Sequence, residues 1–274
     1  MRGPWPLLIA TLASCSPYVH SPPGRTFPLE SAKALNPGEV GVQIEGGGGG
    51  NSDVGLPGFT ARARYGAVDR LDVNGEIAFL RIRPDGEVPA IDSRPFVLTG
   101  RLGLKYAFIE HIAITGGLAA GGWAGGSFLS PDLSLILSYE NRYVVPFLDF
   151  GGFTSHPMRT DDIVVIEDNR IDFIGRPVFT YGWSLGFGLR IPVSHKTGLR
   201  TAPALLIGFR VREAYFGESY LVQGDLEDRS RRELYAFISA GLEIIIATKK
   251  ARRTSTPRAS CPSLFGSHTG VVRH

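Results

Sequence analysis

The stretch FTYGWSLGFGLRI, from Phe179 to Ile191, places a large apolar side chain at every second position. A period of two is the side-chain period of a β-strand, so the stretch predicts a strand with one strongly apolar face. The opposite face carries only Thr, Ser, Gly and one Arg. A solvated face would carry long polar side chains, so these small residues indicate a crowded barrel interior. The apolar face is then expected to contact lipid.

Nine further segments show a similar alternation. Together the ten predicted strands cover residues 39–46, 59–66, 70–82, 96–107, 111–122, 132–140, 142–153, 178–191, 198–212 and 233–247. A tilted strand needs roughly 9–11 residues to cross a bilayer, and most of these segments approach or exceed that length. The sequence therefore predicts an all-β fold, a single antiparallel up-and-down transmembrane β-barrel of about 10 strands, within roughly 8–12.

The connections between these strands alternate in length. Short connections are predicted at 66–69, 108–110, 141 and 194–196, and long ones at 47–58, 83–95, 123–131, 154–177 and 213–232. Outer-membrane barrels have short periplasmic turns and long outer loops, and the alternation predicts the same arrangement here. Because the strand number is even, both ends of the barrel are expected on the short-turn side.

Charged residues occupy the alternating face of several predicted strands, where they are expected to line the lumen and neutralise one another. They are Arg62, Arg64, Asp72, Glu76, Arg101, Lys105, Arg210 and Arg212. Aromatic residues near the strand ends predict two girdles at the membrane interfaces. They are Tyr65, Tyr106, Tyr139 and Tyr143 at the short-turn end, and Trp123, Phe153, Phe179 and Tyr181 at the long-loop end. The alternatives are exposed charges of a soluble β protein, and aromatics that merely favour strands.

The amino terminus has the pattern of a secretory signal peptide, predicted at residues 1–14, with a short apolar run after Arg2. The sequence LASC, which ends at Cys15, resembles the lipobox of bacterial lipoproteins, in which the cysteine is acylated. Cys15 is therefore the predicted lipid-attachment residue, in the periplasmic leaflet of the outer membrane; an ordinary signal peptide is the alternative. Residues 15–38 are predicted to be a Pro/Ser-rich linker, 39–247 the barrel, and 248–274 a basic disordered tail.

Composition excludes several classes of protein. The 274 residues include 35 Gly and 19 Pro, yet 43% are hydrophobic and 20% charged, which is not a disordered composition. Two cysteines exclude a disulfide scaffold. The net charge is +3, and the tail alone holds six Lys or Arg residues and no acid. The rest of the chain is mildly acidic, so nucleic-acid binding is not expected.

The sequence offers little for catalysis. Ser155 and His156, together with Asp161 and Asp162, provide the residue types of a hydrolase site at one interface, but a polar surface loop is the preferred interpretation. No enzyme activity or cofactor is predicted. No metal site is predicted either, because the six histidines and two cysteines lack the spacing of metal ligands. The expected partners are membrane lipids, with small solutes or envelope components as further candidates.

The hairpin YGAVDRLDV, from Tyr65 to Val73, and the Gly/aromatic alternation of residues 179–191 resemble small bacterial outer-membrane β-barrel proteins. This class includes opacity-like and outer-membrane-protein-A-like barrels, and the resemblance covers residues 39–247. It implies a place in the Gram-negative outer membrane and a structural or passive role without catalysis, here with a lipid anchor. The alternatives are a narrow porin-like pore for small solutes, an outer-membrane lipid hydrolase, and a soluble secreted ligand-binding β-barrel.

Overall fold

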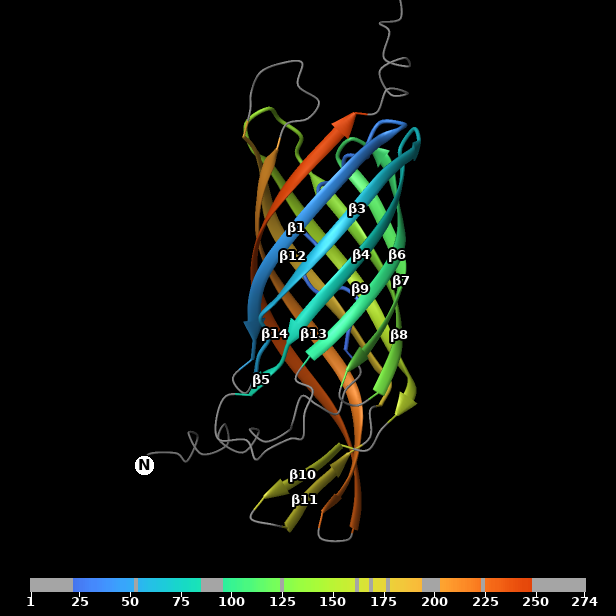
Figure 1. Ribbon diagram of the computed structural model, residues 1–274, viewed down its shortest axis with the longest axis vertical. Coiled ribbons are helices and arrows are strands. Elements are labelled where there is room, and N and C mark those ends of the chain that lie inside the picture. Colours follow the sequence, from blue (N-terminus) through green and yellow to red (C-terminus); the bar gives the residue numbers. More distant parts are fainter. Residues whose placement is uncertain are drawn as a thin grey trace, which may run out of the picture.

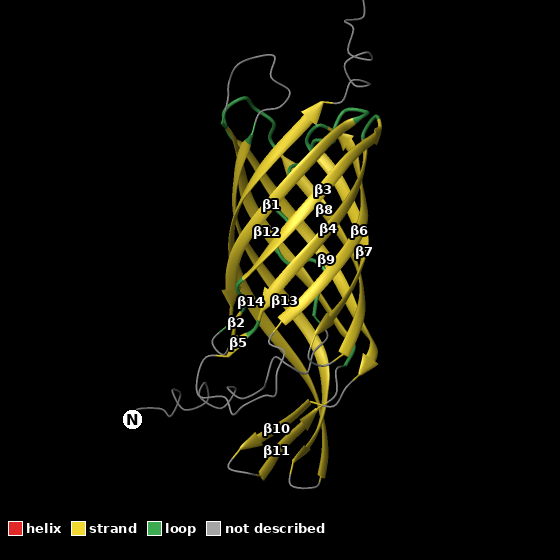
Figure 2. Ribbon diagram, viewed as in Figure 1, coloured by secondary structure: helices red, strands yellow, loops and turns green. Residues whose placement is uncertain are grey.

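A computed structural model describes residues 22–51, 54–84, 96–123, 126–160, 163–167, 170–175, 178–193, 203–222 and 225–247. Across these ranges the chain forms β-strands joined by turns and loops, and no helix is present (Figure 2). The described residues accordingly contain no helix of the length and apolarity that crossing a membrane would require.

Ten long strands form a closed wall (Figure 1). They are β1 (Glu39–Gly50), β3 (Gly58–Val68), β4 (Leu71–Arg81), β6 (Phe96–Ile109), β7 (Ile112–Trp123), β8 (Gly126–Ser138), β9 (Val145–Thr160), β12 (Thr180–Pro192), β13 (Ala204–Val222) and β14 (Asp225–Ala247). Each pairs antiparallel with its neighbours along the chain, and β14 also pairs with β1, which closes the barrel. The predicted fold class is confirmed; only residues 198–202 of the predicted strands lie outside the described ranges.

Four shorter strands lie at the long-loop end of the barrel. Strands β2 (Val54–Gly55) and β5 (Arg83–Pro84) pair with each other, and β10 (Ile163–Glu167) pairs with β11 (Arg170–Gly175). The β10–β11 hairpin and the far ends of β13 and β14 project beyond the barrel (Figure 1). The opposite end carries short turns between β3 and β4 and between β6 and β7.

The wall is apolar outside and polar inside. On β6, Arg101 and Lys105 are 3% and 0% exposed, whereas Leu102 and Leu104 are 73% and 53% exposed. The same alternation runs along the other long strands. This polarity is the reverse of that of a soluble barrel, because lipid rather than water covers the outer face.

Residues 22–38 pass through the lumen from the long-loop end to the short-turn end. Every residue from Gly24 to Ala32 is buried, and Figure 2 shows the loop between the strands of the wall. At the short-turn end the chain reverses into β1 through a turn in which the Glu39 N–H donates to the Asn36 carbonyl at 2.9 Å. Pro37 and Gly38 occupy its centre, and the φ of 81° at Gly38 is that of a type II turn.

The prediction of a linker over 15–38 is therefore wrong for its described part. Proline-rich, strand-free sequence suggested a solvated connection, but residues 22–38 form a plug inside the barrel. We call these residues the plug. Residues 15–21, the predicted signal peptide and the predicted tail lie outside the described residues.

Closure by β1 and β14 can be tested by crosslinking, because Ile44 lies opposite Leu242 on the outer face. With Cys15 and Cys261 replaced by Ser, an Ile44→Cys/Leu242→Cys variant is expected to form a disulfide, since opposite Cα atoms lie roughly 4.5–5.5 Å apart. Leu205 is the partner of Leu242 one strand further on. The Ile44→Cys/Leu205→Cys control spans two strand spacings, about 9.6 Å, and should stay reduced on a non-reducing gel. Crosslinking of the control pair alone would contradict this closure.

Candidate functional site

The lumen is filled by charged side chains from the wall and from the plug. All eight predicted lumen-lining residues are buried: Arg62, Arg64, Asp72, Glu76, Arg101, Lys105, Arg210 and Arg212. Asn74, on the same face of β4 as Asp72 and Glu76, is buried with them. Further buried or partly buried polar residues that the sequence analysis did not single out join them: Arg25, Glu30, Gln43, Glu45, Asp132, Asp149 and Glu243. A polar, tightly filled interior is what a small barrel of this type requires.

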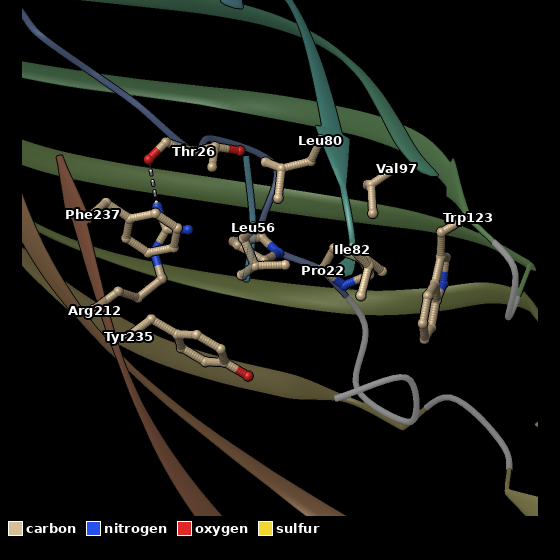
Figure 3. Close-up of a pocket in the computed structure, with 11 residues that line it drawn as sticks. Pro22, Thr26, Leu56, Leu80, Ile82, Val97, Trp123, Arg212, Tyr235 and Phe237 are labelled. Atoms are coloured by element: carbon tan, nitrogen blue, oxygen red, sulfur yellow. Dashed lines mark hydrogen bonds between the residues drawn. The ribbon is translucent and has the colours of Figure 1, made fainter. Parts of the chain in front are cut away.

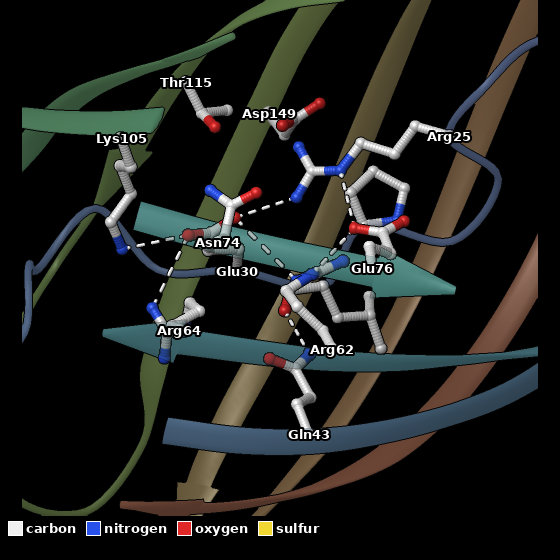
Figure 4. A network of polar contacts seen from close by, with 12 residues as sticks. Arg25, Glu30, Gln43, Arg62, Arg64, Asn74, Glu76, Lys105, Thr115 and Asp149 are labelled. Atoms are coloured by element: carbon white, nitrogen blue, oxygen red, sulfur yellow. Dashed lines mark hydrogen bonds and ion pairs between the residues drawn. The ribbon is translucent and has the colours of Figure 1, made fainter. Parts of the chain in front are cut away.

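Glu30 of the plug is the centre of this network (Figure 4). Its carboxylate lies 2.8 Å from Arg25, 3.0 Å from Lys105, 3.5 Å from Arg64 and 3.8 Å from Arg62. Arg25 belongs to the plug, whereas the other three cations project from β3 and β6. The single carboxylate therefore joins the plug electrostatically to two wall strands.

The wall cations also have acidic partners of their own on neighbouring strands. Arg62 pairs with Glu76 at 2.9 Å and with Glu45 at 3.4 Å, so that the ion pairs cross from β3 to β4 and β1. Arg64 bonds to Glu243 of β14, which itself pairs with Arg190 at 2.5 Å.

Two further arginines bond to side chains on nearby strands of the wall. Arg101 donates to both oxygens of Asp132, at 2.6 and 2.7 Å, and to Asn74 at 2.8 Å. Arg210 donates to Asp149 at 2.7 Å and to the backbone carbonyl of the plug residue Pro28 at 3.2 Å. Charge-assisted bonds of this geometry are stronger than neutral ones.

The wall also satisfies the plug backbone, which has no secondary structure of its own. Wall acceptors take plug N–H groups, as Ser130 does from Gly24 at 2.9 Å and Asp72 from Leu35 at 2.9 Å. Other plug groups bond to the wall along its height: the Ala32 N–H to Ser138, and the carbonyls of Pro22, Leu29 and Lys33 to Ser155, Gln43 and Lys105. These contacts remove the cost of burying free peptide groups.

Small wall residues make the room that the plug occupies. A Cβ added at Gly208 would lie 2.3 Å from the Leu29 side chain, and one added at Gly24 would lie 2.3 Å from Ala119. The apolar plug side chains fill the remaining space, with Phe27 against Phe237 in an edge-to-face contact at 5.7 Å. Plug and wall are therefore complementary in shape as well as in charge.

Six of the eight predicted girdle residues lie on the outer face, and two lie inside the barrel. Tyr65, Tyr106, Tyr139, Tyr143, Phe179 and Tyr181 are exposed on the outer face. Trp123 and Phe153, in contrast, are only 7% and 9% exposed and pack together inside the lumen. The prediction that these two belong to a girdle is wrong. It considered only that they lie near strand ends, and not which face of the strand they occupy. Trp123 shares the parity of the buried Ala119.

Strand parity separates two of the residues that the hydrolase alternative would use. Ser155 and His156 are consecutive residues of β9, so their side chains lie on opposite faces of the wall. The Ser155 hydroxyl faces inward and donates to the Pro22 carbonyl at 2.7 Å, whereas His156 is exposed outside, against Phe179. Asp161 and Asp162 lie outside the described residues. Within the described ranges, no cluster of His, Cys, Asp and Glu suited to a metal ion is present.

A closed barrel of ten antiparallel strands, with an apolar exterior and a charged interior, defines the class of outer-membrane β-barrels. The chain matches no family model and no curated protein. It is similar to solved outer-membrane structures, all at low identity. The outer membrane protein OprG from Pseudomonas aeruginosa aligns over 80% of this chain and 100% of its own, with 9% identity and a TM-score of 0.40.

Two further structures are similar to the same extent. The COG4313 outer membrane channel from Pseudomonas putida F1 aligns over 81% of this chain and 100% of its own, with 14% identity and a TM-score of 0.38. The N-terminal β-barrel domain of Pseudomonas aeruginosa OprF aligns over 77% and 100%, with 12% identity and a TM-score of 0.32. At these levels the functions of those proteins do not transfer to this chain.

Neutralising Glu30 is expected to destabilise the barrel strongly. A Glu30→Gln variant keeps the side-chain shape but removes the carboxylate that four buried cations share, although each keeps another acidic partner. Removing one partner of a buried ion pair costs roughly 3–5 kcal/mol. The free energy of unfolding, measured with urea in lipid vesicles, should fall by about that amount. The matched control is Glu110→Gln at an exposed turn, where a change within about 0.5 kcal/mol is expected. Equal losses of unfolding free energy in the two variants would contradict a central role of Glu30 in the network.

Proposed function

We propose that this protein is a closed β-barrel of the bacterial outer membrane with a structural envelope role, in which the plug blocks the lumen. The reversed polarity of the wall supports the location, because an exposed belt of Leu, Ile and Phe is stable only in lipid. One observation supports the proposal that the lumen is blocked: the plug is hydrogen-bonded to the wall from Pro22 at one end to Leu35 near the other.

A narrow pore for small solutes is the second candidate, and the charged wall favours it. If the plug left the lumen, Arg62, Arg64, Lys105 and Arg210 would line a polar passage. The wall acids that they contact would line it too: Glu76, Glu243, Asp72 and Asp149. A pore function therefore requires displacement of the plug, whereas a structural role requires that the plug remains in place.

Conductance separates these two functions. The full chain in a planar lipid bilayer is expected to show no regular single-channel current, because the plug occupies the lumen. Removing residues 22–37 should produce a stable ion-conducting channel. The matched control lacks 16 residues of the tail, 258–273, and should remain silent. Regular channels from the intact chain would overturn the structural role and support the pore.

We further propose that Cys15 is acylated and that the acyl group lies on the long-loop side of the barrel. The lipobox-like LASC supports acylation, and the position of Pro22 at the long-loop end supports the side. Cys15 lies seven positions before Pro22, a distance of at most about 25 Å when the chain is extended. Since the plug fills the lumen, so short a segment cannot return to the short-turn end, where the sequence analysis expected the anchor.

Two labelling experiments test this anchor. Radioactive palmitate should label the native protein and not a Cys15→Ser variant, because the acylated glyceryl group is attached through a thioether to the Cys15 sulfur. An epitope inserted between Ser16 and Pro17 should bind antibody on intact cells, since the long loops of outer-membrane barrels face outward. The same epitope inserted in the short turn at Glu110 should bind only after permeabilisation. Binding of both epitopes only after permeabilisation would contradict the proposed side.

A further inference from the structure

An apolar cavity of about 50 Å³ lies at the long-loop end of the lumen (Figure 3). Its wall comes from Leu80, Ile82, Val97, Trp123, Tyr235 and Phe237, and the plug residues Pro22, Pro23 and Thr26 close one side. The rest of the lumen is filled by ion pairs and by two smaller apolar clusters, around Ile136 and around Phe147. Apolar, aromatic-lined cavities are typical binding sites for small molecules.

Among the described residues, Arg212 is the only charged one that lines the cavity. It is 4% exposed, and its Nε has no hydrogen-bond partner. Its Nη2 donates to the plug carbonyls of Arg25 and Thr26. Among the described residues no carboxylate forms an ion pair with it, in contrast to Arg210, which pairs with Asp149 at 2.7 Å.

Two aromatic rings partly compensate the buried positive charge of Arg212. The Arg212 guanidinium lies 5.4 Å from the ring centroid of Phe153 and 5.5 Å from that of Phe237. These rings attract a cation through their faces, but they do not accept from the free Nε–H. A buried cation without an anionic partner is costly, and an anion that enters the cavity would remove this cost.

We propose that the cavity binds a small apolar carboxylate, such as a medium-chain fatty acid, with its head group on Arg212. The guanidinium fork matches the two oxygens of a carboxylate. A volume of about 50 Å³ holds roughly four water-sized groups, which suits the head and the first carbons. Arg212 and Trp123 lie at opposite ends of the cavity in Figure 3. The hydrocarbon chain therefore runs along Ile82 and Val97 toward Trp123, the last residue of β7.

The site differs from the ion-pair network in what it recognises. Asp132 and Asp149 are occupied by Arg101 and Arg210, so they do not neutralise Arg212 by direct contact. A neutral apolar molecule would fill the same space but would leave the guanidinium unpaired. The site is therefore expected to select for the negative charge, and this selection is the property to measure. The proposal is independent of whether the lumen conducts ions.

The test uses the full-length protein in nanodiscs of zwitterionic phospholipid, with empty nanodiscs subtracted. The probe is 11-(dansylamino)undecanoic acid, whose fluorescence rises in an apolar site. Decanoate should displace the probe at a concentration at least tenfold lower than decanol does. An Arg212→Met variant should lose this preference, and an Arg81→Met variant, altered at an exposed arginine of β4, should retain it. Equal displacement by decanoate and decanol from the native protein would overturn the proposal.

A second variant covers the case in which Arg212→Met does not fold. Val97→Phe places a larger apolar side chain in the cavity and leaves Arg212 unchanged, so it should reduce probe binding at least tenfold. Folding is checked by the shift in gel mobility between unheated and heated samples, which a closed barrel retains in both variants. Unchanged probe binding by a folded Val97→Phe variant would place the probe outside this cavity and overturn the proposal.

Discussion

The contact between Glu30 and the cations around it is the interaction on which the rest of the interior depends. Arg62, Arg64 and Lys105 project inward from β3 and β6, and strand parity leaves them no route to water. Each of the three also has an acidic partner on the wall. Without Glu30, however, they would lose the carboxylate that all three share, and uncompensated buried charge is costly at low dielectric. The plug supplies that carboxylate, and so the wall and the plug stabilise each other.

The glycine content follows from the same constraint. The chain has 35 Gly, and several wall glycines lie where an added Cβ would strike a side chain of the lumen. At Gly117 it would lie 2.5 Å from the Arg101 guanidinium, and at Gly188 it would lie 2.3 Å from the Phe147 ring. Interior volume is the limiting quantity in a ten-stranded barrel. Small residues in the wall are what allow arginines, aromatic rings and a second length of chain to share it.

The strands and the charged face could be predicted because their signal is local. A period of two needs only the sequence of one strand, and all eight lumen charges fall on the buried parity. Trp123 and Phe153 would have been placed correctly by the same rule. The plug could not be predicted in this way, because its contacts are non-local: Glu30 meets side chains more than 30 positions away. Its sequence lacks the period of two that reveals the strands.

The position of the plug also constrains how the barrel can close. A four-residue turn joins the plug to β1, and β1 pairs over its whole length with β14, from Glu39 opposite Ala247 to Gly50 opposite Ala236. β14 also contributes two of the side chains that complete the interior, Phe237 against Phe27 and Glu243 against Arg64. If β14 paired first, the preceding chain would have to thread a closed and crowded lumen. If the plug is already in place, the last strand meets both its hydrogen-bonding edge and its interior partners at once. The second order needs no threading, so the contacts of β14 favour closure around the plug.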